Sequence, residues 1–196
     1  MNRKTHDTTN VLVVGTGGQG VITASEILSD VAMVSGFDTK KSEIHGMSQR
    51  GGVVTSHVRY SDKVYSPIIM EGEADLLLSF EVAETVRWLH YLKPGGRAIT
   101  SLQRIVPPAV YAGMGSYPEN PEETIRERSK NPILVDALPM ATQLGNPRLV
   151  NTLLLGMAST LLDLPLDKWK TVIENRVPPK FKELNLVAFE QGRSVA

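Results

Sequence analysis

The sequence predicts an α/β fold: a Rossmann-like, mostly parallel sheet flanked by helices in three layers, followed by an all-helical C-terminal third. Two observations support this prediction. Short apolar runs bounded by glycine alternate with stretches of helical periodicity over the first two-thirds of the chain, as expected for strands joined by helices. From residue 138 onward the apolar spacing is only helical.

The length and composition are those of one globular domain. At 196 residues, the chain falls within the usual domain size of about 100–200 residues, so we expect one domain over 1–196 with a flexible segment at 1–9. Basic and acidic residues balance at 21 each, which gives no electrostatic reason to expect a nucleic acid or membrane partner. The N-terminus lacks an apolar signal core, so we expect a cytoplasmic protein.

The first part of the chain predicts the start of the sheet. The valine-rich run before the first glycines is typical of a buried strand, and the apolar residues that follow have helical spacing up to Gly36, which suits a helix C-terminus. The expected elements are a strand at 11–14, a helix at 21–34, a strand at 37–43, a loop at 44–52 and an alternating, half-buried strand at 53–61.

The rest of the chain completes the sheet and then turns helical. In order, we expect a strand at 74–81, a helix at 82–92, a turn at 93–96, a strand at 97–102, an irregular proline-containing stretch at 103–131 with one charged helix at 121–129, and a strand at 132–137. Within the helical part, Asn146 followed by Pro147 is typical of a capped helix start.

The stretch GTGGQG between the first strand and helix is the first candidate site. Gly15, Gly17 and Gly20 match the G-x-G-x-x-G pattern in its strand–turn–helix context, and Gly18 and Gln19 add a further glycine and a side-chain amide. Glycines at such a turn allow close approach of a dinucleotide pyrophosphate, of another anion, or of another part of the protein. The pattern alone leaves these three alternatives open.

The end of the second predicted strand argues against a nicotinamide cofactor. An NAD-binding domain places an acidic residue about 20 residues after the glycines. Here Lys40 and Lys41 occupy that neighbourhood, and Glu43 comes slightly late.

A second candidate loop, IHGMSQRGG, follows this strand. It combines an imidazole, a hydroxyl, an amide, a guanidinium and paired glycines, namely His45, Ser48, Gln49, Arg50, Gly51 and Gly52. Because loops that leave the carboxyl ends of parallel strands gather at one edge of a sheet, we expect the two loops to be neighbours.

The two loops together resemble a known family. GTGGQGVITASEIL followed by EIHGMSQRGGVVTSHVRYSD is similar to the gamma-type domain of the 2-oxoacid:ferredoxin oxidoreductases. The second loop is most similar to its form in the beta subunit of the indolepyruvate branch. The resemblance extends to ADLLLSFE, LKPGG and LGNPRLVNTLLLG, and so covers most of the chain.

The resemblance implies a role within a larger enzyme. Such enzymes oxidatively decarboxylate a 2-oxoacid on thiamine diphosphate, pass electrons through iron–sulfur clusters to ferredoxin, and release an acyl-CoA. This chain has neither a Gly-Asp-Gly motif for thiamine diphosphate nor any cysteine for a cluster, and its four histidines are too scattered for a zinc site. The resemblance therefore implies an accessory subunit that is inactive and binds no cofactor alone.

The same resemblance places the reactive groups elsewhere. Thiamine diphosphate, Mg²⁺ and the iron–sulfur clusters are expected on a large alpha-type partner subunit, with coenzyme A as co-substrate and ferredoxin reached through the complex. The alternatives are a stand-alone Rossmann-type domain that binds a nucleotide or NAD(P), and a scaffold whose glycine loops only pack against a neighbour.

The sequence leaves two possible roles for each side chain of the second loop. Arg50 is a candidate for clamping a carboxylate or a CoA phosphate, or for pairing with an acid across a subunit interface. His45 is either a proton donor near the substrate or a structural hydrogen-bonding residue. Ser48 and Gln49 are candidates for ligand or interface hydrogen bonds. We expect both loops to face the partner near an anionic group.

Overall fold

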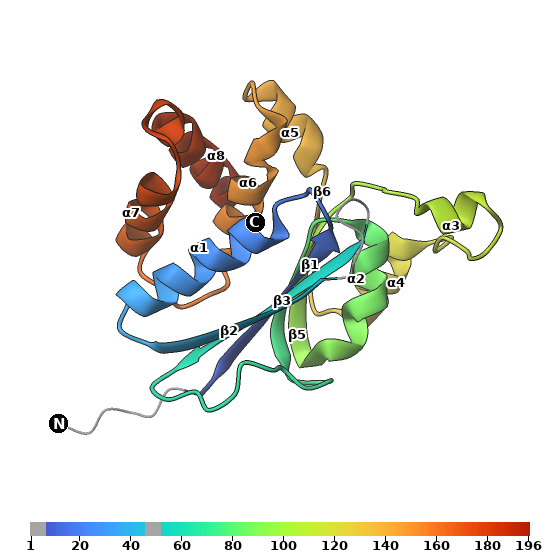
Figure 1. Ribbon diagram of the computed structural model, residues 1–196, viewed down its shortest axis with the longest axis horizontal. Helices are drawn as coiled ribbons and strands as arrows, with labels where there is room; N and C mark the ends of the chain where they lie inside the picture. The colour runs from blue at the N-terminus through green and yellow to red at the C-terminus, as the bar shows by residue number, and fades with distance from the viewer. Residues whose placement is uncertain (1–6, 46–51) are drawn as a thin grey trace.

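The computed structural model describes residues 7–45 and 52–196, which form a sheet with helices on both faces (Figure 1). Its strands are β1 (Thr9–Thr16), β2 (Asp38–His45), β3 (Val53–Ser61), β4 (Ala74–Ser79), β5 (Leu92–Ser101) and β6 (Ile133–Val135). Its α-helices are α1 (Val21–Val34), α2 (Val82–Trp88), α3 (Pro108–Tyr111), α4 (Pro121–Arg128), α5 (Ala137–Gln143), α6 (Val150–Ala158), α7 (Leu166–Arg176) and α8 (Lys182–Ser194).

The strand order in the described sheet is β2-β3-β1-β4-β5-β6. Strands β1, β4, β5 and β6 run parallel to their neighbours in this series, whereas β3 is antiparallel to both β1 and β2. The prediction of a mostly parallel sheet is therefore confirmed. Because β3 lies between them, β2 is not a direct neighbour of β1.

Two hydrophobic clusters lie on opposite faces of the sheet, and alternate residues of β1 enter each. Val11 and Val13 join the cluster formed with α1, α6, α7 and α8. Leu12 and Val14 join the cluster formed with α2 and α4. All four side chains are fully buried. This alternation explains why the first strand is an uninterrupted apolar run: both of its faces are covered.

The C-terminal part is helical, as predicted, from Ala137 onward. Helices α6 and α8 cross in close contact at two glycines. A Cβ atom on Gly156 would lie 2.2 Å from the carbonyl oxygen of Phe189, and one on Gly192 would lie 2.1 Å from that of Leu153. Since real Cβ contacts are not this short, glycine at both positions is required for the two backbones to approach this closely.

Several predicted boundaries were wrong. The loop expected at 44–52 begins later, because Ile44 and His45 continue β2 and pair with Thr55 and Val54 of β3. The helix expected at 82–92 ends at Trp88 and is followed by a 3-10 helix, Leu89–Tyr91. The strands expected at 74–81, 97–102 and 132–137 span 74–79, 92–101 and 133–135.

The turn predicted at 93–96 lies inside β5. Ala74 of β4 pairs with Leu92, but Leu76 pairs with Arg97, so the intervening residues of β5 bulge out of register. Gly95, with φ of 82°, provides the positive backbone angle that this excursion requires. Proline and glycine at 93–96 do break the regular strand, but because β5 pairs with β4 on both sides of them, these residues form a bulge within a strand.

Candidate functional site

The glycine turn, residues 15–20, connects β1 to α1 at the carboxyl edge of the sheet. Gly18 and Gly20 have φ angles of 98° and 85°, so both adopt a backbone conformation that favours glycine. Gly20 is the N-cap of α1, and no side chain of the described residues caps this helix. With no cap from the described residues, the N-terminus of this 14-residue helix directs N–H groups and a partial positive charge at its surroundings.

The glycines of this turn serve different purposes. A Cβ atom on Gly15 would lie 2.8 Å from Oε1 of Gln19, and one on Gly20 would lie 2.2 Å from Nδ2 of Asn151. At Gly18 no atom of residues 7–45 or 52–196 lies within 4 Å of the position that a Cβ atom would occupy. Packing within the protein therefore accounts for Gly15 and Gly20, whereas no described group packs against Gly18.

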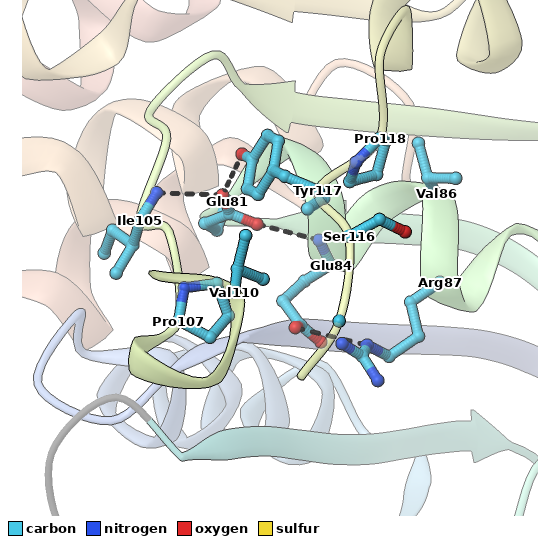
Figure 2. A pocket seen from close by; sticks show the side chains of 12 residues that line it. Glu81, Glu84, Val86, Arg87, Ile105, Pro107, Val110, Ser116, Tyr117 and Pro118 are labelled. Atoms are coloured by element: carbon cyan, nitrogen blue, oxygen red, sulfur yellow. Dashed lines mark hydrogen bonds and ion pairs between the residues drawn. The ribbon is translucent and has the colours of Figure 1, made fainter. Parts of the chain in front are cut away.

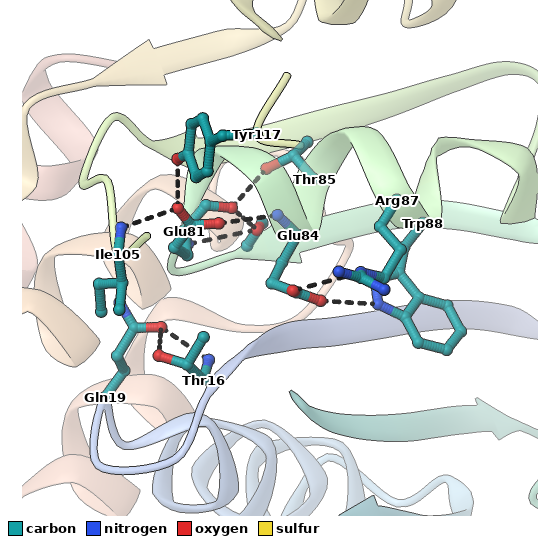
Figure 3. Close-up of polar contacts among 10 residues, drawn as sticks. Thr16, Gln19, Glu81, Glu84, Thr85, Arg87, Trp88, Ile105 and Tyr117 are labelled. Atoms are coloured by element: carbon teal, nitrogen blue, oxygen red, sulfur yellow. Dashed lines mark hydrogen bonds and ion pairs between the residues drawn. The ribbon is translucent and has the colours of Figure 1, made fainter. Parts of the chain in front are cut away.

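The side chain of Gln19 holds the turn together. Its Oε1 accepts hydrogen bonds from the Thr16 backbone N–H at 2.8 Å and from the Thr16 hydroxyl at 3.1 Å. Its Nε2 donates to the Phe80 carbonyl oxygen at 2.8 Å and to Oε1 of Gln103 at 3.0 Å. The amide thus uses two acceptor and two donor interactions within the chain. Figure 3 shows the two contacts with Thr16.

The second predicted loop meets the glycine turn at its end. The Gly17 backbone N–H donates to the Gly52 carbonyl oxygen at 2.8 Å, and Thr16 pairs with Val53. His45 closes β2. Ser48, Gln49, Arg50 and Gly51 lie outside the described residues. The juxtaposition of the two loops arises because β3 returns antiparallel beside β1.

A cavity of about 440 Å³ opens beside the glycine turn. Its lining comes from the glycine turn, the start of α1, the segment just after β5, helix α5, and the 3-10 turn that leads into α6 together with the start of α6: Gly18, Gln19, Gly20, Thr23, Gln103, Leu138, Pro147, Arg148, Val150 and Asn151. The Arg148 side chain is exposed, and no acid in the described part of the chain pairs with it. Asn151 donates to the Gly20 carbonyl oxygen at 3.3 Å.

The predicted Asn–Pro helix start positions these two residues. Asn146 accepts a hydrogen bond from the Arg148 backbone N–H at 3.0 Å and caps the 3-10 turn Pro147–Leu149, from which α6 continues. The cap was recognisable in the sequence, but sequence reasoning missed Arg148 and Asn151 as site residues. An arginine directly after an Asn–Pro cap was the available signal.

A second cavity, of about 310 Å³, lies between α2 and a long connection that we call the strap, residues 103–118 (Figure 2). Glu81, Glu84 and Arg87 line it from the α2 side. Mostly apolar strap residues line the other side, including Ile105, Pro107, Val110, Tyr117 and Pro118.

Glu81 closes the base of the strap. Its side chain is 1% exposed; Oε2 accepts from the Glu84 backbone N–H at 2.8 Å, which caps α2. Oε1 accepts from the Ile105 backbone N–H at 3.0 Å and from the Tyr117 hydroxyl at 2.5 Å. One carboxylate oxygen therefore binds both ends of the strap (Figure 3). Burial, together with the bond to Glu81, raises the pKa of the Tyr117 phenol.

Glu84 is the second buried acid at this cavity. Burial raises the pKa of its carboxyl group, while Arg87 opposes that shift. The Arg87 Nε lies 3.3 Å from Oε1, and the Trp88 indole N–H donates to Oε2 at 3.2 Å. Sequence reasoning missed both acids. ADLLLSFE predicts only a buried strand and gives no sign that its last residue, Glu81, caps a helix and holds a distant loop, and Glu84 follows in a segment that predicts only a helix.

The described residues contain no group of three or more metal-ligating side chains. No helix in the same residues is both long and apolar enough to cross a bilayer.

Comparison with known proteins gives consistent matches over nearly the whole chain. Residues 10–195 match the family model described as pyruvate ferredoxin/flavodoxin oxidoreductase. Indolepyruvate oxidoreductase subunit IorB from Pyrococcus horikoshii is 38% identical over 192 residues, covering 95% of each chain.

Solved structures share the fold. The gamma subunit of a keto/oxoacid ferredoxin oxidoreductase from Geobacter sulfurreducens superposes with a TM-score of 0.72 at 23% identity, over 96% of this chain and 98% of that one. The 2-oxoglutarate:ferredoxin oxidoreductase from Magnetococcus marinus gives a TM-score of 0.75 at 19% identity, over 97% of this chain and 31% of that larger one. This chain belongs to the pyruvate ferredoxin/flavodoxin oxidoreductase family.

Proposed function

We propose that the chain is the accessory subunit of a cytoplasmic indolepyruvate-type 2-oxoacid:ferredoxin oxidoreductase. The complete enzyme oxidatively decarboxylates an arylpyruvate to an acyl-CoA and reduces ferredoxin. The observation that carries this proposal is the end-to-end match to an indolepyruvate oxidoreductase subunit, at 38% identity over 95% of both chains. A match of that extent includes both loops and the sheet edge that presents them.

The residues of this chain do not fit the reactive cofactors of such an enzyme. Iron–sulfur clusters are held by cysteine thiolates, and the sequence has none. The described residues offer no acid cluster for Mg²⁺. We therefore assign thiamine diphosphate, Mg²⁺ and the clusters to a large partner subunit, and no chemical step of the reaction to this chain.

We assign the glycine turn and its cavity to an anionic neighbour. The turn contributes the N-terminus of α1, no described group packs against Gly18, and Arg148 adds an unpaired positive charge among the described residues. Arg50 adds a further charge from the second loop. These groups favour a phosphate or carboxylate of the substrate complex, coenzyme A included, or an acidic segment of the partner.

Affinity purification of the tagged chain from its own cells, followed by assay, tests the subunit function. We expect a complex with a large cysteine-rich chain that reduces a viologen dye with indolepyruvate in a CoA-dependent reaction, faster than with pyruvate or 2-oxoglutarate. The separated chain is expected to have no such activity. Activity of the chain alone, or a complex that prefers another 2-oxoacid, would contradict this proposal.

Substitution of the charged side chains tests the anion site. Arg148→Ala or Arg50→Ala should weaken assembly, or raise the KM for the 2-oxoacid or CoA, about tenfold or more, because a hydrogen bond to a charged group contributes about 1.5–3 kcal/mol. Arg128→Ala is the matched control, since Arg128 ends α4, on the opposite face of the sheet. If assembly and KM are unchanged in both test variants, the glycine turn serves only internal packing and binds no anionic group.

The stand-alone NAD(P)-binding alternative gains no support from the sheet. A dinucleotide site needs an acid on the strand beside β1, at the same edge as the glycines. Here that neighbour is the antiparallel β3, and Glu43 on β2 is engaged by Lys41. Saturable NADH binding to the purified chain at micromolar concentration would revive this alternative.

A further inference from the structure

The glycine turn and the strap are joined through a pair of glutamine side chains. Gln103, the first residue of the strap, contacts both sides of this junction. Its side-chain Oε1 accepts from Gln19 Nε2 at 3.0 Å, and its carbonyl oxygen accepts from the Val82 backbone N–H at 3.1 Å. Gln103 also lines the cavity beside the glycine turn, while Ile105, two residues later, lines the cavity under the strap.

The orientation of both amides follows from their partners. Gln19 Oε1 faces the Thr16 N–H, and its Nε2 faces the Phe80 carbonyl oxygen, so the Gln19 amide has one satisfactory orientation. Its remaining N–H must then find an acceptor, which Gln103 supplies. A shift of the strap at Gln103 removes that acceptor and releases one of the four bonds that hold the turn.

We propose that Gln19 is a positioning residue that makes the conformation of the glycine turn depend on the conformation of the strap, through its hydrogen bond to Gln103. The coupling runs along the carboxyl edge of the sheet, from the Thr16 backbone through the two amides to the strap. Glu81 holds the base of the strap at Ile105 and Tyr117, as Figure 3 shows. Occupation of either cavity by a ligand or a partner residue is thereby transmitted to the other.

This inference goes beyond the proposed function, because it requires neither the partner subunit nor a substrate. It also assigns to Gln19 a role that differs from direct ligand binding. The four hydrogen-bonding positions of its amide are all used inside the chain, so its effect on the cavity is exerted through the backbone that it holds.

Residue-resolved amide hydrogen exchange on the full chain tests the coupling. Gln103→Met keeps the length of the side chain and removes the acceptor. Exchange of the Thr16, Gly17 and Gln19 amides should rise about 2- to 12-fold, since a net hydrogen bond contributes a factor of about that size. Gln103→Glu keeps an acceptor at the same reach and should leave these amides near their wild-type rates. Gln103→Asn, which is too short to bridge, provides a second disconnecting variant if Gln103→Met does not fold.

Tyr117→Phe tests transmission from the strap to the turn. It removes the hydrogen bond from the Tyr117 hydroxyl to Glu81 and leaves Gln103 unchanged, so exchange should rise within the strap and, through Gln103, in the glycine turn. A rise confined to the strap would contradict the proposal. The proposal is wrong if Gln103→Met leaves the turn amides unchanged. It is equally wrong if Gln103→Glu accelerates them as much as Gln103→Met does, because loss of the acceptor would then not be the cause.

Discussion

Replacing Gly20 by alanine tests what the glycine turn is built around. The new methyl group would meet the Asn151 amide of α6, with its carbon 2.2 Å from Nδ2. Gly18 offers a matched control two residues away. It has a similar positive φ, 98° against 85°, but no atom in the described part of the chain lies within 4 Å of its Cβ position. The two substitutions therefore share a backbone cost and differ in the steric collision.

The expected magnitudes follow from these two terms. A non-glycine residue in the left-handed region costs about 1–2 kcal/mol, which is all that Gly18→Ala should lose. Gly20→Ala adds about 1–3 kcal/mol for overpacking, and about 1 kcal/mol for the hydrogen bond from Asn151 to the Gly20 carbonyl oxygen, which the displaced amide gives up. We expect a total of about 3–6 kcal/mol, enough to leave a typical domain marginal.

Urea unfolding followed by far-UV circular dichroism measures both losses. The fluorescence of the fully buried Trp169 on α7 reports the C-terminal helices in the same samples. Asn151→Ala completes a double-mutant cycle. Combined with Gly20→Ala, it should cost about 2–4 kcal/mol less than the sum of the single changes, because the collision is gone and the hydrogen bond is lost only once. Equal losses for Gly18→Ala and Gly20→Ala, or strictly additive effects, would refute the assignment of Gly20 to helix packing.

Two further predictions concern the stability of the fold. Burial lowers the pKa of His57 below its usual value of 6.5, and its Nδ1 accepts from the Ile69 backbone N–H at 3.1 Å. The neutral ring therefore stabilises the fold above pH 6.5. This contribution is lost as the pH falls through the lowered pKa, by up to about 1.4 kcal/mol per pH unit. His57→Asn keeps an acceptor and should reduce the pH dependence of the denaturation midpoint between pH 7.5 and 5.5, about the range in which histidine titrates. An unchanged slope of the midpoint against pH would contradict this. Gly192→Ala should lower the unfolding free energy by about 3 kcal/mol or more, since its Cβ would lie 2.1 Å from the Leu153 carbonyl oxygen; a thermal melt within a few degrees of wild type would show that α6 and α8 separate easily.

The elements of the fold could be predicted where one physical requirement dominates the local sequence. The run from Val11 to Val14 is apolar throughout because both faces of β1 are covered, and β3 was predicted with its observed bounds, 53–61, from simple alternation. The errors occurred where pairing partners decide the outcome. Residues 93–96 have the composition of a turn, yet they are a bulge because β4 continues on both sides of them.

The candidate site could be predicted only in part, because its members come together from distant segments. The glycine turn and the second loop are recognisable as local motifs. Asn151 and Gln103 reach the turn from 131 and 84 residues away, and no local pattern distinguishes them from ordinary polar residues. Glu81 is similar: its role depends on Ile105 and Tyr117, which lie 24 and 36 residues further along the chain.

The position of β3 explains why this chain carries a dinucleotide-type glycine pattern without the rest of a dinucleotide site. In a Rossmann domain the second strand lies beside the first, so that its acidic end reaches the ribose of a ligand held at the glycines. Here β3 separates them, and its start brings the Gly52 carbonyl oxygen to the Gly17 N–H. The edge that would receive a ribose is thus occupied by the chain itself. Gly15 and Gly20 lie against the side chains of Gln19 and Asn151, whereas no described atom lies within 4 Å of the Cβ position of Gly18. The glycines suit a tight strand-to-helix turn, and we propose that the accessible part of this edge, beside Arg148, receives an anionic group presented from outside.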